Sequence, residues 1–235
     1  MASYTTFQTL VPEIKQYCHG APDIMIRTHI RNAAILFCER TMCLKKAPSA
    51  FFLSEDTHTY TLKYSADKYV AIDIKDAQIG EGSTGSPLAI TTEHRLEKSV
   101  SKWSTREATK PLALFLTDDV NTVRFYPIPS EDSDDDVYIT TVVRPKKDQT
   151  EMDTFLYEKW EDTIQAGALS SLLAMPQASW FNGRLSIDFG REFKRGVMRA
   201  RKNTLSGYGD EPGQVTPQSF ANTGQMTGGG IYTWE

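Results

Sequence analysis

The sequence predicts an α+β fold: an antiparallel helical bundle of three main helices, with an inserted antiparallel β domain and an extended C-terminal arm. Two observations predict it. Apolar residues recur at steps of three and four near both ends of the chain, and alternate with polar residues in the middle. Residues 205–235 show neither period. The predicted organisation is a helical domain of residues 1–49 and 150–204, a β domain of residues 50–149, and an arm of residues 205–235.

The N-terminal segment predicts one short and one long helix. The short helix is Pro12–Tyr17. The long one, Asp23–Cys43, is predicted as a main helix because one face consists of residues at helical spacing. These residues are Ile26, Ile30, Ala33, Ala34, Phe37 and Thr41. Pro48 prevents the helix from continuing.

From Phe51 the period changes to two. Tyr60–Tyr64 and Tyr69–Ile74 alternate and are separated by turn residues, which predicts a β-hairpin. Further predicted strands are Leu88–Thr92, Leu112–Leu116, Thr122–Tyr126 and Val137–Val143. The short connections between them favour an antiparallel sheet. Because neither set of helices buries its apolar stripe alone, we expect the helices on both sides of the sheet to pack together.

The segment Asp153–Lys202 predicts two antiparallel helices with a break at Met175–Ala178. The face of the first consists of Leu156, Trp160, Ile164, Gly167, Ala168, Ser171, Leu172 and Met175. The face of the second consists of Phe181, Leu185, Phe189, Phe193, Val197 and Ala200. Gly167 and Gly196 are small enough to let the two backbones approach closely. We therefore expect helix packing to centre on Trp160, Gly167, Phe193 and Gly196.

The residues after Lys202 differ from the rest of the chain. Thr204–Glu235 has no Lys or Arg, seven glycines and two prolines, which predicts an extended arm or a disordered tail. At about 3.3 Å per residue, an extended arm of this length reaches roughly 100 Å. Such an arm orders on a partner through apolar anchors. The candidate anchors are Tyr208, Phe220, Ile231, Tyr232 and Trp234.

Composition excludes several classes of protein. The formal net charge of −4 gives no overall basic field that indicates nucleic-acid binding, so any such signal must be local. No apolar run approaches the roughly 18 residues of a membrane span, and Met1–Leu10 is too polar for a signal peptide, so we expect no membrane contact. Cys18, Cys38 and Cys43 are odd in number and lack metal-finger spacing, which favours reduced thiols.

One motif raises the question of a cofactor. Gly80–Gly85 matches the G-x-G-x-x-G pattern, but a dinucleotide site needs a helix directly after the glycines. Here Ser86-Pro87 leads into a predicted strand, which favours a hairpin loop. The sequence also lacks paired metal-ligand spacings and a G-x-S-x-G elbow. We expect no catalytic, cofactor-binding or metal-binding residues and no enzyme, with a small nucleotide-dependent enzyme as the weakest alternative.

The last predicted helix carries seven cations and two anions between Arg184 and Lys202, a local net charge of +5. At about 100° per residue, four cations form one stripe, here called the basic stripe. They are Arg184, Arg191, Arg195 and Lys202. The stripe is either a solvated face or a surface that meets phosphate or an acidic protein. The acidic run Glu131–Asp136 of a neighbouring subunit is one such surface, and a nucleic-acid-binding module is an alternative function.

Three stretches together resemble the head-to-tail adaptor (connector) family of tailed bacteriophages, of the type called tail tubular protein A. The first is Ala34–Thr41, similar to a family helix that ends in Phe-Cys-x-Arg-Thr, and the second is Val123–Pro129. The third combines Val142–Pro145, Ala166–Pro176 and the run from Phe193 to Arg201. The resemblance covers Pro12–Lys202 and is densest after residue 110.

The resemblance implies a structural protein of the virion neck, assembled in the host cytoplasm. Such a protein forms a homo-oligomeric, dodecameric ring under the portal, continues the DNA channel for genome ejection, and is the platform for the tail nozzle or tail tube protein. The C-terminal arm is implied to dock on the portal protein, while DNA passes through the channel without sequence-specific contact. Phe51–Thr109 and the glycine-rich arm contain no motif that matches the family.

Overall fold

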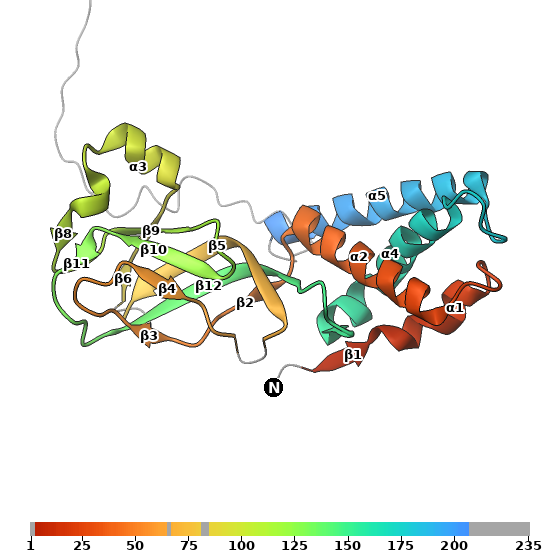
Figure 1. Ribbon diagram of the computed structural model, residues 1–235, viewed down its shortest axis with the longest axis horizontal. Helices are drawn as coiled ribbons and strands as arrows, with labels where there is room; N and C mark the ends of the chain where they lie inside the picture. The colour runs from red at the N-terminus through yellow and green to blue at the C-terminus, as the bar shows by residue number, and fades with distance from the viewer. Residues whose placement is uncertain (1–2, 65–66, 81–84, 207–235) are drawn as a thin grey trace, which may run out of the picture.

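The computed structural model describes residues 3–64, 67–80 and 85–206. Two lobes lie along the long axis of the molecule (Figure 1). The helical lobe contains residues 3–43 and 151–206, and the β lobe contains the strands between them. The predicted arm anchors Tyr208, Phe220, Ile231, Tyr232 and Trp234 lie outside the described residues.

The helical lobe is built on three long helices. They are α2 (Asp23–Thr41), α4 (Thr154–Leu173) and α5 (Gly183–Ser206). Strand β1 (Tyr4–Thr6), the 3₁₀ helix η1 (Phe7–Leu10) and helix α1 (Val11–Lys15) precede them. Strand β1 pairs with β13 (Glu151–Asp153), which holds the N-terminal segment against the start of α4. Helix α2 ends because Met42 adopts a left-handed conformation, with φ of 53°, and donates its N–H to the Cys38 carbonyl.

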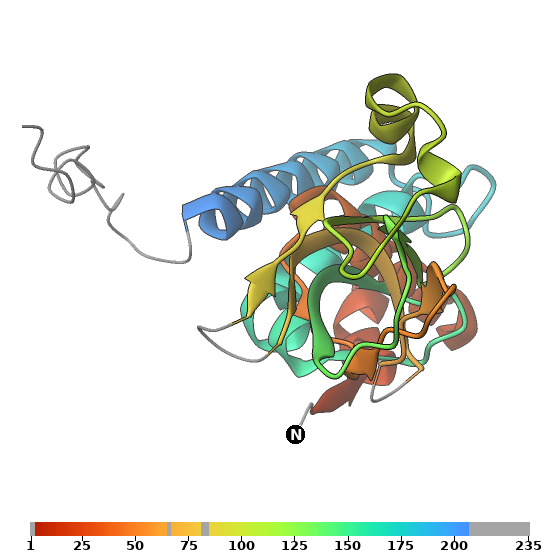
Figure 2. The ribbon, with the colours of Figure 1, turned by 90° about the vertical axis from the view of Figure 1, so that its left-hand side faces the viewer.

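The β lobe consists of two sheets that curve around a common interior (Figure 2). The first sheet contains β2 (Lys45–Lys46), β12 (Asp136–Pro145), β5 (Tyr69–Ile79), β6 (Ser86–Pro87) and, beside β12, β3 (Phe51–Phe52). The second contains β4 (Thr59–Thr61), β10 (Thr122–Tyr126), β9 (Ala113–Leu116) and β7 (Ala89–Ile90). A separate pair joins β8 (Glu107–Ala108) to β11 (Ile128–Pro129), and α3 (Glu93–Ser99) and the 3₁₀ helix η3 (Trp103–Thr105) lie between β7 and β8.

Each lobe has its own apolar core. In the helical lobe, Phe37, Leu156 and Ile164 are fully buried between the long helices. In the β lobe, Leu114 and Phe125 from the second sheet face Val137 from the first. Burial of apolar surface contributes about 25 cal/mol per Å², so each core supplies the main favourable term for its lobe.

Asp153 joins the two lobes. One carboxylate oxygen caps α4 by accepting the Phe155 N–H at 3.0 Å. The other forms an ion pair with Lys46 of β2 and accepts the Tyr69 hydroxyl hydrogen at 2.9 Å. Burial raises the pKa of Tyr69, and the hydrogen bond with Tyr4 and the nearby Asp153 charge raise it further, so the phenol stays a donor. One buried side chain thus connects α4, β2 and β5.

The predicted fold class is wrong. Instead of a bundle of three main helices with an inserted antiparallel β domain, the described residues contain five α-helices and thirteen strands in several sheets. Two strand pairs, β7 with β9 and β8 with β11, are parallel. Strand β7 falls within the predicted strand Leu88–Thr92. Helix α3 and the other two-residue strands were missed because such short elements produce no readable period.

The predicted hairpin is also wrong. Its two strands correspond to β4 and β5, but β4 pairs with β10 in the second sheet and β5 pairs with β12 in the first. Alternation identifies a strand without identifying its partner. Helix α2, by contrast, was predicted with the right start and an end two residues too late, because its period is long and regular.

Replacing Asp153 with Ala is expected to lower the free energy of unfolding by about 3 kcal/mol, because it removes the α4 cap and leaves the Lys46 charge half-buried and unpaired. Urea unfolding followed by circular dichroism measures the change. The control is Asp67→Asn, which breaks the exposed pair with Lys146 and is expected to cost under about 1 kcal/mol. Equal effects of the two changes would show that Asp153 has no special role.

Candidate partner-binding surface on the last helix

Helix α5 lies against α4 through small residues. A Cβ on Gly167 of α4 would lie 2.8 Å from the Phe193 ring, and a Cβ on Gly196 of α5 would lie 2.3 Å from Thr163 Oγ1. Neither position accepts a larger side chain without movement, so both glycines permit the close approach of the two helices. Trp160, the fourth predicted packing residue, is buried at a kink of α4, and its ring centroid lies 5.5 Å from that of Phe37.

Two serines add polar contacts to the same interface. The Ser170 hydroxyl donates to the Ser186 carbonyl at 3.0 Å, and the Ser186 hydroxyl donates to the Ser170 carbonyl at 2.7 Å. These reciprocal bonds fix the rotation of α5 about its axis. Because Ser186, Phe193 and Ala200 face inward, the opposite face of α5 lies in solvent.

The basic stripe occupies that outer face. Arg184, Arg191, Arg195 and Lys202 are all exposed, and so are Lys194, Arg199 and Arg201. Among the ion pairs between described residues, the stripe contributes one, a 3.3 Å contact from Arg191 to Asp188. None of the other stripe cations forms an ion pair with another described residue. The helix therefore presents concentrated positive charge to an external partner.

Apolar side chains interrupt the charge on this face. Ile187 is 59% exposed and Met198 is 72% exposed. At about 100° per residue, both project within about 60° of the centre of the stripe. A solvated helix face gains nothing from such residues, whereas a protein interface combines charge with apolar contact.

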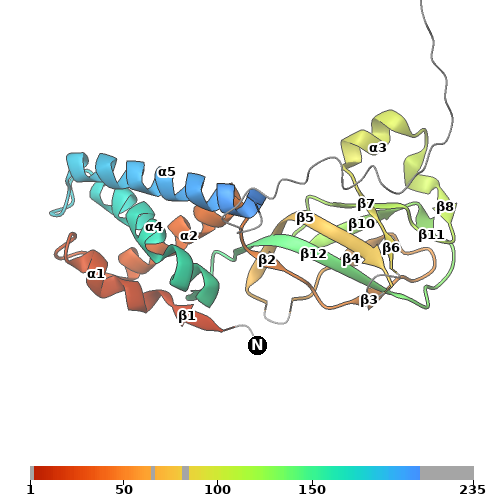
Figure 3. The same ribbon diagram turned by 180° about the vertical axis from the view of Figure 1, so that it is seen from behind.

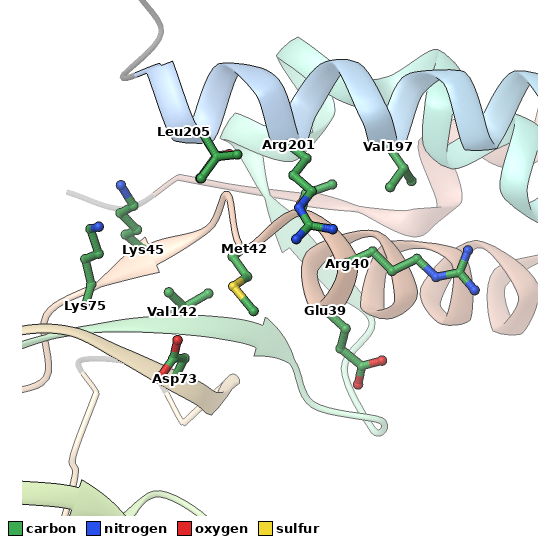
Figure 4. Close-up of a pocket in the computed structure, with 12 residues that line it drawn as sticks. Glu39, Arg40, Met42, Lys45, Asp73, Lys75, Val142, Val197, Arg201 and Leu205 are labelled. Carbon is green, nitrogen blue, oxygen red and sulfur yellow. The ribbon is translucent and has the colours of Figure 1, made fainter. Parts of the chain in front are cut away.

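The C-terminal end of α5 forms one wall of a cleft between the lobes (Figure 4). The cleft has a volume of about 520 Å³. Its walls come from the end of α2, from strands β2, β5 and β12, and from α5. Met42 and Val142 supply apolar surface, and Arg201 extends from α5 toward Met42. The cleft adjoins the point where the chain continues beyond Ser206.

A second charged surface lies on the other side of α4. Gln165 donates to both Glu13 of α1 and Glu161 of α4, and Asp162 is exposed beside them. Burial raises the pKa of Glu161, and repulsion from Glu13 and Asp162 raises it further. We call Glu13, Glu161 and Asp162 the acidic flank.

The acidic flank and α5 lie on opposite sides of α4. The α4 residues that contact α5 are Thr163, Gly167 and Ser170. At about 100° per residue, the direction in which they project is about 160° from that of Glu161, Asp162 and Gln165. The ribbon agrees, because α5 and α1 lie at opposite edges of the helical lobe in two views (Figures 1 and 3).

No protein-family model and no curated protein matches this sequence. Among the described residues, no group of three or more His, Cys, Asp or Glu side chains is arranged to hold a metal ion. None of the helices there has both the length and the apolar character of a membrane span.

The glycine-rich motif connects antiparallel strands. Gln78 and Ile79 of β5 pair with Pro87 and Ser86 of β6, so a strand follows the glycines, as the context of the motif predicted. Residues 81–84 themselves lie outside the described residues.

The predicted apolar face of the last helix is wrong at its start. Phe181 precedes α5 and is 53% exposed, and Leu185 is 38% exposed. The break between the helices is longer than predicted, because Asn182 ends it by accepting the Leu185 N–H at 3.1 Å.

Sequence reasoning missed the acidic flank and the cleft. Glu161 and Asp162 are visible as neighbouring acids on a predicted helix, but Glu13 comes from the other end of the chain. Lys45 and Lys75 reach the cleft from strands of the β lobe. Nothing in the sequence indicates that these strands lie close to the end of α5.

The change Gly196→Ala is expected to destabilise the protein by about 1–3 kcal/mol, because the new methyl group overlaps Thr163. The matched control is Gly183→Ala, where the nearest atom of Phe181 is at an ordinary 3.5 Å and helix propensity favours Ala. Urea unfolding curves of both variants test this. A stabilised Gly196→Ala variant would show that the helices do not approach closely at this position.

The change Glu161→Gln is expected to raise the unfolding temperature of the dilute protein at neutral pH. Because the folded state holds the Glu161 proton more tightly than the unfolded state, Glu161 costs stability as pH rises above about 4. The gain should shrink toward zero below about pH 3, where Glu161 is protonated in both states. Thermal scans across pH check this, with the exposed Glu97→Gln as control. A pH-independent gain would contradict the electrostatic cause.

Proposed function

We propose that the protein is a structural head-to-tail adaptor of a tailed bacteriophage. It forms a dodecameric ring under the portal in the virion neck, continues the DNA channel and supports the tail nozzle. The segment after Ser206 docks on the portal protein. The protein carries out no reaction and requires no cofactor in this role.

The observation that carries the proposal is that the first and third stretches resembling the adaptor family meet in the fold, and that two parts of the third pack on each other. Glu39, in the first motif, forms an ion pair of 3.1 Å with Arg144, in the third. Gly167 in the Ala166–Pro176 stretch receives the ring of Phe193 from the last stretch. Segments far apart in the chain thus form the contacts between α2 and β12 and between α4 and α5. This supports a shared architecture rather than a set of chance matches.

The position of α5 supports the same proposal. Its outer face is basic, and its last turn leads directly into the glycine-rich segment from the edge of the cleft. An adaptor needs one rigid surface for neighbouring copies and one extendable segment for a second protein. Helix α5 supplies the first and begins the second.

A second candidate is a nucleic-acid-binding module, favoured by the unpaired cations of the basic stripe. It predicts tight binding to free DNA with an affinity that falls steeply with salt. It also predicts a smaller salt slope after Arg191→Gln and Arg195→Gln. The adaptor proposal predicts weak binding and little effect of these changes on DNA affinity.

Mixing the protein with the portal protein of the phage that encodes it is expected to give rings seated on portal assemblies, visible by electron microscopy. A chain ending at Ser206 should retain its circular dichroism spectrum but lose portal attachment, because the docking segment is gone. Monomers that never associate with the portal would reject the adaptor function.

A finer comparison uses full-length variants. The pair Tyr232→Ala and Trp234→Ala is expected to weaken portal binding at least roughly tenfold, because aromatic side chains are common interface anchors. The matched pair Gln218→Ala and Gln225→Ala in the same segment should have little effect. Equal binding by both pairs would reject the aromatic anchors while leaving the ring intact.

A further inference from the structure

We propose that the outer face of α5 in one copy docks on the acidic flank of a second copy of this chain. The contact pairs Arg191 and Arg195 with Glu161 and Asp162. This inference rests on the proposed ring and specifies the surfaces through which neighbouring subunits join.

Charge complementarity selects the partner. Helix α5 has seven exposed cations, four of which form the basic stripe on its outer face, whereas the acidic flank concentrates three carboxylates that repel one another. Lys15, a cation close to Glu13 in the chain, already pairs with Asp23 at 2.5 Å. A second copy brings further counter-charge to each surface, beyond the Asp188 that already pairs with Arg191.

The arrangement on opposite sides of α4 determines the kind of assembly. Two complementary patches on opposite sides of one molecule do not satisfy each other within that molecule. Each copy therefore offers one patch to a neighbour on each side, which is a heterologous contact. Repeating such a contact closes a ring when the rotation between neighbouring copies allows it. All copies in such a ring have the same orientation relative to the ring axis.

The apolar residues of α5 favour a protein over DNA as the partner. Ile187 and Met198 lie beside the stripe cations and are more than half exposed. A phosphate backbone offers them no apolar surface, whereas the half-buried Phe155 and Tyr157 of α4 lie near the acidic flank in the chain. Apolar contact combined with a charged rim is the usual composition of a subunit interface.

The acidic run Glu131–Asp136 is the competing partner for the stripe. It lies in the β lobe, and Asp132 is already engaged because it accepts the Glu55 N–H at 2.8 Å. A contact between that loop and α5 would place the β lobe of one copy on the helical lobe of the next. The flank on α4 lies on the same lobe as α5, so it permits neighbours to stand side by side.

Charge reversal tests the contact in the full-length protein. The variant Arg191→Glu with Arg195→Glu, and separately the variant Glu161→Lys with Asp162→Lys, are each expected to weaken self-association at least roughly tenfold, because like charges then face each other. Analytical ultracentrifugation at low salt measures this, and thermal unfolding verifies that each variant is folded. The control is Asp134→Lys with Asp135→Lys, which is expected to leave assembly unchanged.

Mixing the two reversed variants provides the decisive result. One variant then has two acidic faces and the other two basic faces, so each associates with the other but not with itself. The mixture is expected to recover assemblies in which the variants alternate. Recovery would not follow if either variant were misfolded.

The possible outcomes separate this inference from the proposed function. Wild-type protein that stays monomeric both alone and with the portal would overturn both. Wild-type rings that persist in both reversed variants, or that are lost in the Asp134 and Asp135 control instead, would overturn only the contact proposed here. Restoration of assembly by mixing would establish it.

Discussion

The buried carboxylate of Asp153 is the interaction on which the two-lobe arrangement depends. It caps α4, pairs with Lys46 and accepts a hydrogen bond from Tyr69, so the start of one helix and two strands are fixed together. A buried charge with three partners tolerates little displacement, because losing any partner leaves it uncompensated. The direction of α4 relative to the β lobe follows from this geometry, and the position of α5 follows from that of α4.

The close packing of α4 and α5 determines which face of α5 is exposed to solvent. With Phe193 against Gly167 and Thr163 against Gly196, α5 has one rotational setting, and the reciprocal serine bonds support it. The cations then project away from the lobe, and the acids of α4 project to the other side. A charge separation across a single helical layer thus results from the positions of two glycines.

The sequence predicted those parts of the fold that repeat over several turns. Helix α2 and the α4–α5 pair were predicted because their apolar residues recur at helical spacing over several turns. Helix α3 buries only one residue, Leu96, so its sequence shows no periodicity. Strand partners were not predictable, because β4 and β5 alternate equally well in a hairpin and in separate sheets. The basic stripe follows from helical spacing alone, but the acidic flank needed the contact of Gln165 with Glu13.

The position of the last turn of α5, beside the cleft between the lobes, has a mechanical consequence. A pull on the chain beyond Ser206 enters the protein along the axis of α5, close to the junction of the lobes. Such a load shears the long α4–α5 contact, in which many packed side chains resist together, instead of peeling one strand from a sheet edge. In the proposed adaptor, tension on the segment that docks on the portal is therefore borne by the whole length of the α4–α5 contact.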